Sequence, residues 1–190
     1  VVAVSGGRAG VLVGLLCTGC EADALGGVGG VVQASDYLEG VSSATWRETE
    51  DTGDLDDASV VRGVVGEEGT MEIRRGRRFV EGEPVGSFTF TSGVEDLILA
   101  AWSWGGEGSE EPTYLAREGS IPGESMENGE GACLLESSEG LETYFGTFGL
   151  AISSTCEGAA APDGVYWFAP GVGLVRADTT VFFLDLVSPH

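Results

Sequence analysis

The sequence predicts a mainly β domain: a single curved antiparallel sheet or half-barrel of roughly ten strands, with little helix. Three observations predict this class. Short apolar runs with two-residue alternation recur along the chain, no helical stripe is longer than about two turns, and Gly supplies 32 of the 190 residues. Glycine at that frequency suits tight turns and bulges. A hydrophobic content of 42% is enough for a packed core, so the chain as a whole is not expected to be disordered.

The expected strands follow one another at short intervals, and two connections have clear signals. Arg74-Arg75-Gly76 lies between two runs and indicates a hairpin turn. Pro170-Gly171 fits a type II turn, because Pro presets φ at the first corner and Gly accepts positive φ at the second. The expected strands cover 44–49, 59–65, 70–73, 77–81, 88–90, 97–104, 113–116, 141–148, 150–156, 165–169, 172–176 and 180–187.

The expected strand 97–104 is apolar on both faces. Strict alternation places Leu97 and Leu99 on one face and Trp102 and Trp104 on the other. Such a strand needs cover on both sides, or it borders a cavity. These four residues are therefore our candidate face for an apolar ligand, although a plain core with a covering loop explains them as well.

The charge of the chain excludes several classes of function. Its 31 acidic and 9 basic side chains give a formal charge of −22, which repels nucleic acid and anionic membrane surfaces. The only His is His190 and there is no Lys, so Ser-His or Cys-His nucleophilic arrangements are not expected. We expect no enzymatic activity, no cofactor and no metal. A carboxylate-dependent hydrolase, with Glu107 near Trp102 and Trp104, is a remote alternative.

Two charged segments are candidate ion sites. Residues 48–57 contain six carboxylates, which suit Ca²⁺, but their spacing does not match the twelve-residue calcium loop, and a solvated acidic loop explains them. The chain has one basic cluster, formed by Arg74, Arg75, Arg77 and Arg78. These arginines could hold an anionic headgroup or polymer, or they could form a solvated hairpin tip.

The N-terminal residues have the features of a secretory signal peptide. The apolar run 9–16 spans roughly 12 Å as a helix, which is too short for the ~30 Å hydrocarbon core and typical of a signal peptide. Thr18-Gly19-Cys20 follows it and resembles the lipobox of bacterial lipoproteins, although position 17 is Cys where Leu is usual. An ordinary buried helix with two incidental thiols is the alternative.

The lipobox resemblance implies a division of the chain. In that family the signal peptide is removed and the Cys is acylated, which here gives a signal peptide 1–19, a lipidated Cys20 on a Gly-rich tether 20–35, and a β domain 36–190. Acyl chains would then anchor the protein in the membrane of a bacterial cell envelope, with the outer membrane expected.

The same resemblance leaves one pair of cysteines. Removal of Cys17 and lipidation of Cys20 leave Cys133 and Cys156, which lie 23 residues apart. In an oxidising compartment we expect them to form a disulfide, worth about 3 kcal/mol in the chain-entropy model. Two free thiols or a metal pair are the alternatives, although no third ligand completes a zinc set.

A second resemblance lies near the C-terminus. Residues 167–176 read WFAPGVGLVR and are similar to the ending of many uncharacterised bacterial envelope lipoproteins. Those proteins also have an early Asp-Tyr…Trp segment and a Gly-Thr-Phe strand, matched here by Asp36-Tyr37, Trp46 and 146–148. The resemblance implies a curved sheet similar to the half-barrel of the lipoprotein-carrier (LolA/LolB-like) group. It brings no catalytic residues.

The expected function is therefore a binding or structural role for a lipid-anchored envelope protein, with an apolar ligand or another envelope protein as partner. A carrier that holds an apolar ligand or lipoprotein acyl chains on the concave sheet face is the alternative. An acidic-loop calcium binder or a hydrolase is more remote.

Overall fold

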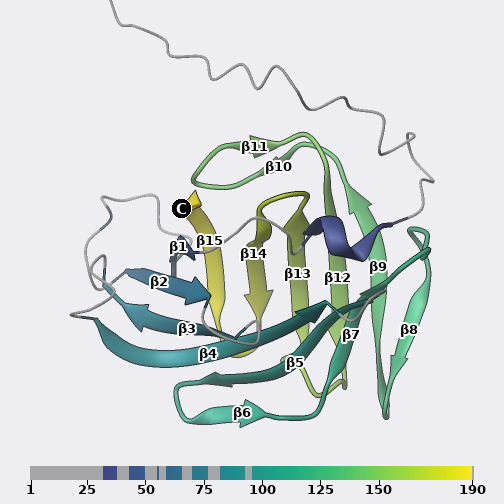
Figure 1. The fold of residues 1–190 in the computed structure, drawn as a ribbon, viewed down its shortest axis with the longest axis horizontal. Coiled ribbons are helices and arrows are strands. Elements are labelled where there is room, and N and C mark those ends of the chain that lie inside the picture. Colours follow the sequence, from purple (N-terminus) through teal and green to yellow (C-terminus); the bar gives the residue numbers. More distant parts are fainter. Residues whose placement is uncertain are drawn as a thin grey trace, which may run out of the picture.

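The computed structural model of the chain describes residues 32–37, 43–49, 55, 59–65, 70–76, 82–92 and 96–189. The fold is mainly β, as predicted (Figure 1). The helical part of the described residues is one short 3-10 turn, η1 (Ala34–Tyr37). None of the described helices is long and apolar enough to cross a membrane.

Thirteen strands form the main sheet. They are β1 (Ser43–Arg47), β2 (Val60–Val65), β3 (Thr70–Arg75), β4 (Glu83–Ser92), β5 (Asp96–Trp104), β6 (Glu107–Ser109), β7 (Thr113–Arg117), β8 (Ser125–Asn128), β9 (Gly131–Ser138), β12 (Ala151–Glu157), β13 (Gly164–Ala169), β14 (Gly173–Thr179) and β15 (Phe183–Pro189). A separate hairpin contains β10 (Leu141–Glu142) and β11 (Thr147–Phe148).

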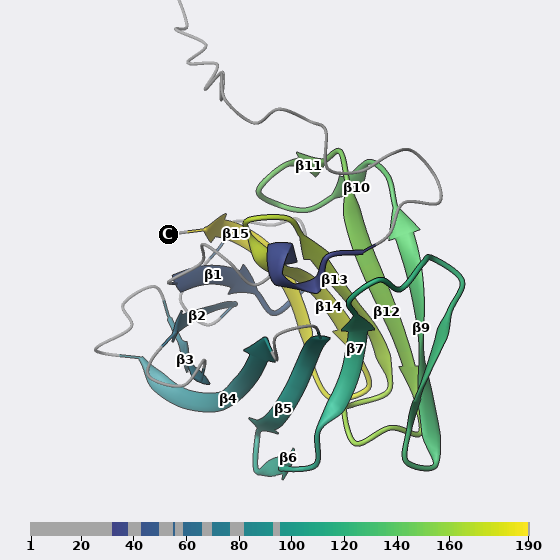
Figure 2. The same ribbon diagram turned by 45° about the vertical axis from the view of Figure 1, so that its right-hand side comes forward.

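The main sheet is antiparallel and curved. Its strand order is β6-β5-β4-β3-β2-β1-β15-β14-β13-β12-β9-β8, and β7 pairs with β5 beside β6. Most neighbours follow one another in the chain, whereas the β1–β15 ladder joins the first strand to the last. Figure 2 shows how the curvature brings β7 round toward β9, and β7 also contacts β8.

The described strands do not close into a barrel, because no backbone ladder joins β7 to β8. The side chain of Asn128 bridges the two strands instead. Its Oδ1 accepts a hydrogen bond from the Tyr114 N–H at 2.7 Å, and its Nδ2 donates to the Tyr114 carbonyl at 3.1 Å. One side-chain amide thus makes the pair of bonds that a neighbouring strand would make.

Aromatic rings fill the inner face of the curved sheet. Phe88, Trp104 and Phe182 are buried, and their ring centroids lie 5.1 to 5.9 Å apart. Phe168 and Tyr166 extend the same cluster through Phe90 and Phe182. Rings at these distances are in packing contact, so this part of the interior is a core.

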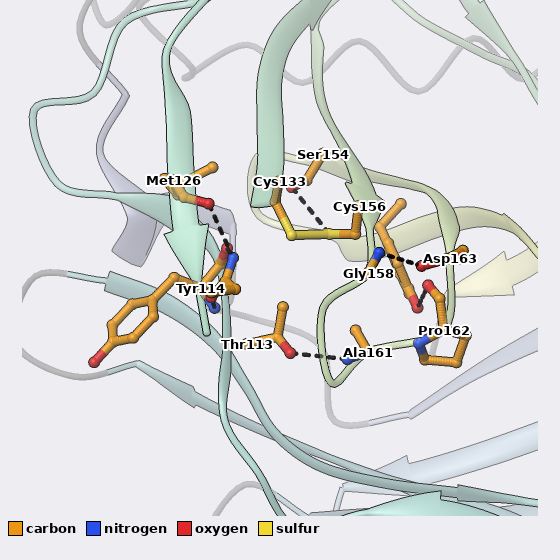
Figure 3. Close-up of a disulfide and its surroundings, with 12 residues drawn as sticks. Thr113, Tyr114, Met126, Cys133, Ser154, Cys156, Gly158, Ala161, Pro162 and Asp163 are labelled. Atoms are coloured by element: carbon orange, nitrogen blue, oxygen red, sulfur yellow. Dashed lines mark hydrogen bonds between the residues drawn. A yellow bond between two sulfur atoms is a disulfide. The ribbon is translucent and has the colours of Figure 1, made fainter. Parts of the chain in front are cut away.

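Both open ends of the curved sheet are covered. At one end Val32 is buried and exchanges backbone hydrogen bonds with Gly119 and Ser120. At the other end the 158–163 connection enters the sheet, where the Ala161 N–H donates to the Thr113 hydroxyl at 2.9 Å (Figure 3). The fold therefore includes Val32, four residues before the predicted start of the domain.

The predicted disulfide is confirmed. Cys133 on β9 and Cys156 on β12 are directly opposite each other in the ladder and form a disulfide, with a Cα–Cα distance of 4.1 Å (Figure 3). The bond joins two strands that the backbone already pairs, and both cysteines are fully buried.

The predicted type II turn is also consistent with the structure. Gly171 has φ +67°, and the Val172 N–H donates to the Ala169 carbonyl at 3.1 Å. The Gly171 N–H itself donates to the Asp36 carbonyl, so this turn also holds η1 in place.

The strand count exceeds the prediction of roughly ten. The sequence reading placed no strand at β6, β8 or β9, where Gly and Glu interrupt the apolar alternation. It also placed one strand over 141–148, where the structure has the β10–β11 hairpin. Gly146, with φ +152°, and the paired bonds between Thr143 and Gly146 turn the chain there. The expected strand 77–81 lies outside the described residues.

Candidate functional site

Two exposed aromatic side chains form the most distinctive surface feature. Tyr144 is 47% exposed and Phe145 is 53% exposed, and we call this pair the aromatic tip. The other large hydrophobic side chains exposed in the described residues are Ile121 (45%) and Leu134 (38%), which are not neighbours of the tip in sequence. The tip therefore stands out because two rings are adjacent.

The local sequence builds the tip as a short hairpin. Leu141 and Glu142 of β10 pair with Phe148 and Thr147 of β11. The Phe145 ring stacks on the Phe148 ring, with centroids 6.2 Å apart and an interplanar angle of 29°. This contact fixes the orientation of one of the two tip rings.

The tip is attached to β15 through backbone groups. The Phe145 N–H donates to the Leu186 carbonyl at 2.8 Å, and the Tyr144 N–H donates to Asp185 Oδ2 at 3.1 Å. The guanidinium of Arg47 also lies over the Tyr144 ring, 5.2 Å from its centroid. These contacts hold the rings at the surface in a fixed place, so their exposure is not a consequence of a loose loop.

The aromatic tip contacts a buried ion pair between Arg47 and Asp185, which we call its seat. Asp185 is 1% exposed, and its Oδ2 accepts hydrogen bonds from Arg47 Nε at 2.9 Å and Nη2 at 2.8 Å. Asp185 Oδ1 is buried with no hydrogen-bond partner. Because burying both charges costs desolvation energy, a pair of this kind contributes more to fixing the positions of the groups it joins than to net stability.

The ion pair lies on the outer face of the sheet, opposite the core. Leu184 and Leu186 point into the core, so Asp185 between them points out. Arg176 is directly opposite Asp185 on β14, and its guanidinium lies over the rings of Trp167 and Phe183, at 5.4 and 5.3 Å. These two cation–π contacts favour this position of the guanidinium on the outer face.

The surroundings of the tip are acidic. Glu139 and Glu142 are both exposed and lie within six residues of Phe145 in sequence. Together with the charge of −22, they make the region around the rings unfavourable for an anionic surface.

The structure places two members of the predicted basic cluster, Arg74 and Arg75, on opposite faces of β3. Arg74 lies on the outer face and pairs with Glu72, whereas Arg75 lies on the opposite face and pairs with Glu48 at 2.8 Å. The hydrogen bond with Glu48 raises the pKa of Arg75. Arg77 and Arg78 lie outside the described residues. Arg74 and Arg75 therefore do not share one face, because they alternate across the strand.

The predicted apolar-ligand residues share one face, against the alternation expected from sequence. A bulge at Ala100 lies between Leu99, which pairs with Phe90, and Ala101, which pairs with Thr89. The shift puts Leu97 and Leu99 on the same inner face as the two tryptophans. Three of these residues (Leu97, Leu99 and Trp104) are buried.

The remaining member, Trp102, is partly buried and packs against the core. Its indole N–H donates to the Ala160 carbonyl at 2.8 Å. The four residues are thus part of a packed interior and do not line an open ligand face.

Other predicted features are described only in part. No group of three or more His, Cys, Asp or Glu side chains in the described residues could hold a metal ion. Of the acidic segment 48–57, only Glu48, Thr49 and Leu55 are described. Cys20 and the rest of 1–31 lie outside the described residues. Two open hollows, of about 480 and 560 Å³, share Thr155 and Glu157 as lining residues.

Sequence reasoning missed the aromatic tip and its seat. The tip rings fell inside a predicted strand, although the glycines Gly140 and Gly146 on either side could have indicated a turn. Asp185 is a lone charge in an apolar strand, which could have indicated a buried partner, but the partner Arg47 is 138 residues away.

Comparisons of this chain with protein-family models, with curated proteins and with solved structures gave no match.

Proposed function

We propose that this chain is a lipid-anchored protein of a bacterial cell envelope that acts by binding another protein through its aromatic tip, without catalysis. The observation that carries the proposal is the fixed exposure of Tyr144 and Phe145, at 47% and 53%. Aromatic side chains dominate the energetics of protein interfaces. Rings that are already held in place lose little conformational entropy on binding.

A protein partner fits the surroundings of the tip better than a bilayer does. Exposed Glu139 and Glu142 and the charge of −22 disfavour anionic lipid. The same charges favour a partner whose apolar pocket is bordered by basic residues, because such a pocket would take the rings and pair with the carboxylates.

The Cys133–Cys156 disulfide supports the extracytoplasmic location. Disulfides persist in oxidising compartments and are rare in the cytosol. The lipobox-like Thr18-Gly19-Cys20 supports anchoring through Cys20. Mass spectrometry of the mature N-terminus tests the anchor: we expect a chain that starts at acylated Cys20, and a chain that keeps residues 1–19 contradicts the anchor.

The carrier alternative gains no support from the inner face. Phe88, Trp104 and Phe182 occupy it at ring-to-ring packing distances, so an acyl chain would have to displace them. The non-catalytic binding role is therefore the function that we propose.

Site-specific photo-crosslinking in the native host tests the binding role. A photoreactive phenylalanine analogue replaces Phe145 in one strain and Ile121 in a control strain, because Ile121 is also exposed (45%). We expect a discrete protein adduct from position 145 and none from position 121. The captured protein is then purified, and its Kd for the full chain is measured.

The expected result is a Kd at least ~10-fold weaker for Phe145→Ser, a change of about 1.4 kcal/mol, because aromatic side chains at the centre of an interface are often its hot spots. Ile121→Ser should leave the Kd unchanged. Adducts with lipid alone would contradict the protein partner and indicate that the tip contacts a membrane. Equal adducts at both positions would show that the aromatic tip is not the binding surface.

A further inference from the structure

Two arginines face each other on the outer face of the sheet. Arg62 on β2 is directly opposite Arg74 on β3 in the backbone register. Their chain neighbours Val61 and Ile73 are fully buried in the core, so alternation places both guanidinium groups on the outer face. Like charges directly opposite each other destabilise a sheet.

Arg62 is the exception among the six described arginines. Arg47, Arg74 and Arg75 each form an ion pair, and Arg117 and Arg176 each lie over an aromatic ring. Within the described part of the chain, no hydrogen bond, ion pair or ring contact involves the side chain of Arg62. This is unexpected for a chain with 31 acidic side chains.

The position of Arg62 makes its lack of a partner costly. The residue is partly buried and its Nε is fully buried without an acceptor. Arg74 differs, because its Nη1 donates to the Gly82 carbonyl at 3.0 Å and its Nη2 pairs with Glu72. A buried donor without an acceptor loses its hydration and gains nothing in return, and a charged donor loses most. An acceptor between the two guanidinium groups would remove this cost.

A third group extends the row. Thr45 on β1 is directly opposite Arg62 on its other side, so its hydroxyl lies on the same face. Two guanidinium groups and a hydroxyl, side by side on three adjacent strands, match the several acceptor oxygens of one tetrahedral anion. We propose that Thr45, Arg62 and Arg74 form a binding site for a phosphate group.

The nearby charges set the expected strength. Glu72 pairs with Arg74 through Nη2 at 2.6 Å and competes with the anion. Arg47 is two residues from Thr45, but Asp185 compensates its charge. Arg62 is therefore the uncompensated positive charge of the site, which should bind phosphate modestly.

The phosphate could be free or part of a lipid headgroup. The negative charge of the whole chain repels an anionic bilayer far more than a small ion, so we expect free phosphate to bind. The two sources need separate arms in the experiment.

Thermal unfolding of the purified full chain tests the site. The Tm is measured against increasing inorganic phosphate, with NaCl adjusted to keep the ionic strength constant. We expect the Tm to rise in wild type, with the apparent phosphate Kd at least ~10-fold weaker in Arg62→Gln. Without phosphate, Arg62→Gln should raise the Tm by about 1–3 °C, because it removes the facing like charge and the unpaired donor.

Two variants complete the design. Arg117→Gln is the matched control, because it removes one positive charge from an exposed position on β7 and should leave the phosphate response unchanged. Glu72→Gln should tighten phosphate binding about 3-fold or more, because it releases Arg74 and removes a repulsive charge.

Phosphate raises the Tm of many proteins by exclusion from their surface, and that effect would be equal in all variants. An equal Tm response in wild type and Arg62→Gln would therefore overturn the proposal, as would weaker binding by Glu72→Gln. In the second arm, Arg62-dependent binding to phosphatidylglycerol vesicles without a response to inorganic phosphate would identify a headgroup as the source.

Discussion

The two faces of the sheet bury different kinds of side chain. The inner face buries neutral rings and aliphatic side chains, and packing alone satisfies them. The outer face buries charges, which need partners of matching chemistry. Asp185 has Arg47 on that face, whereas Arg62 faces another arginine.

This difference separates groups that define the fold from groups that carry chemistry. A ring such as Phe88 packs well wherever its shape fits. A buried guanidinium is stable only with an acceptor, so its surroundings indicate what completes it. In Arg47 the acceptor is part of the chain and positions the aromatic tip. In Arg62 the acceptor has to come from outside.

The largest effect should come from the inner face. Phe88→Ala should lower the free energy of unfolding by about 4 kcal/mol, because it opens a cavity between Trp104 and Phe182. Thr89→Ala, one residue away on the outer face, should cost less than about 1 kcal/mol. Urea unfolding of both variants measures the contrast, and equal losses would show that the inner face is not the main core.

The next prediction tests whether loss of a charged group on the outer face lowers the free energy of unfolding nearly as much as loss of a core ring. Asp185→Ala should cost about 3 kcal/mol, because it removes the carboxylate that compensates the partly buried charge of Arg47. Asp178→Ala is the control, since Asp178 is exposed on β14, and should stay within about 0.5 kcal/mol. Similar urea midpoints for the two variants would contradict a structural role for the ion pair.

A smaller effect is a loss of stability at alkaline pH, because the buried side chain of Tyr37 must stay neutral. Burial, with a contribution from Asp36, raises the pKa of Tyr37 to about 12. Because the folded chain then holds this proton more tightly than the unfolded chain, whose Tyr has its ordinary pKa near 10, the stability is complete below pH 10 and falls as the pH rises toward 12. Burial likewise raises the pKa of Tyr166.

Tyr37→Phe separates the two tyrosines. The Tyr37 hydroxyl is buried without a partner, so the substitution should not lower stability at pH 7. It should also reduce the loss of stability between pH 10 and pH 12, followed by circular dichroism. An unchanged alkaline transition would assign the loss to other groups.

The smallest effect concerns the link between the outer face and the tip. Tyr144→Leu removes the ring under Arg47 but keeps the N–H that bonds Asp185, so it should cost only about 0.5–1 kcal/mol. Urea unfolding measures it. A loss as large as that of Asp185→Ala would mean that the ring, and not the ion pair, holds the hairpin.

The sequence predicted the features that depend on local pattern. Alternating runs and glycines indicated a curved antiparallel sheet, and Pro170-Gly171 indicated its turn. The Cys133–Cys156 bond followed from counting cysteines after the expected processing. Short strands with few apolar residues, such as β8, were missed because pairing with neighbouring strands keeps them extended and their own composition does not indicate a strand.

The site depended on contacts that no local pattern reveals. The bulge at Ala100 reverses the alternation of β5, and only the pairing with β4 shows it. Arg47 and Asp185 meet because the first and last strands are neighbours. Arg62 is visible in the sequence as a charge among valines, but its lack of a partner is a property of three strands together.

The bridge at Asn128 also has a chemical consequence. It is the only asparagine in the chain, and Gly129 follows it, the neighbour that least obstructs attack of the backbone nitrogen on a side-chain amide. Hydrolysis of that amide would replace the donor facing the Tyr114 carbonyl by a carboxylate oxygen, and two acceptors would then repel each other. Deamidation of Asn128 would therefore weaken the link between β7 and β8, and the fraction of deamidated chains should increase with the age of the protein.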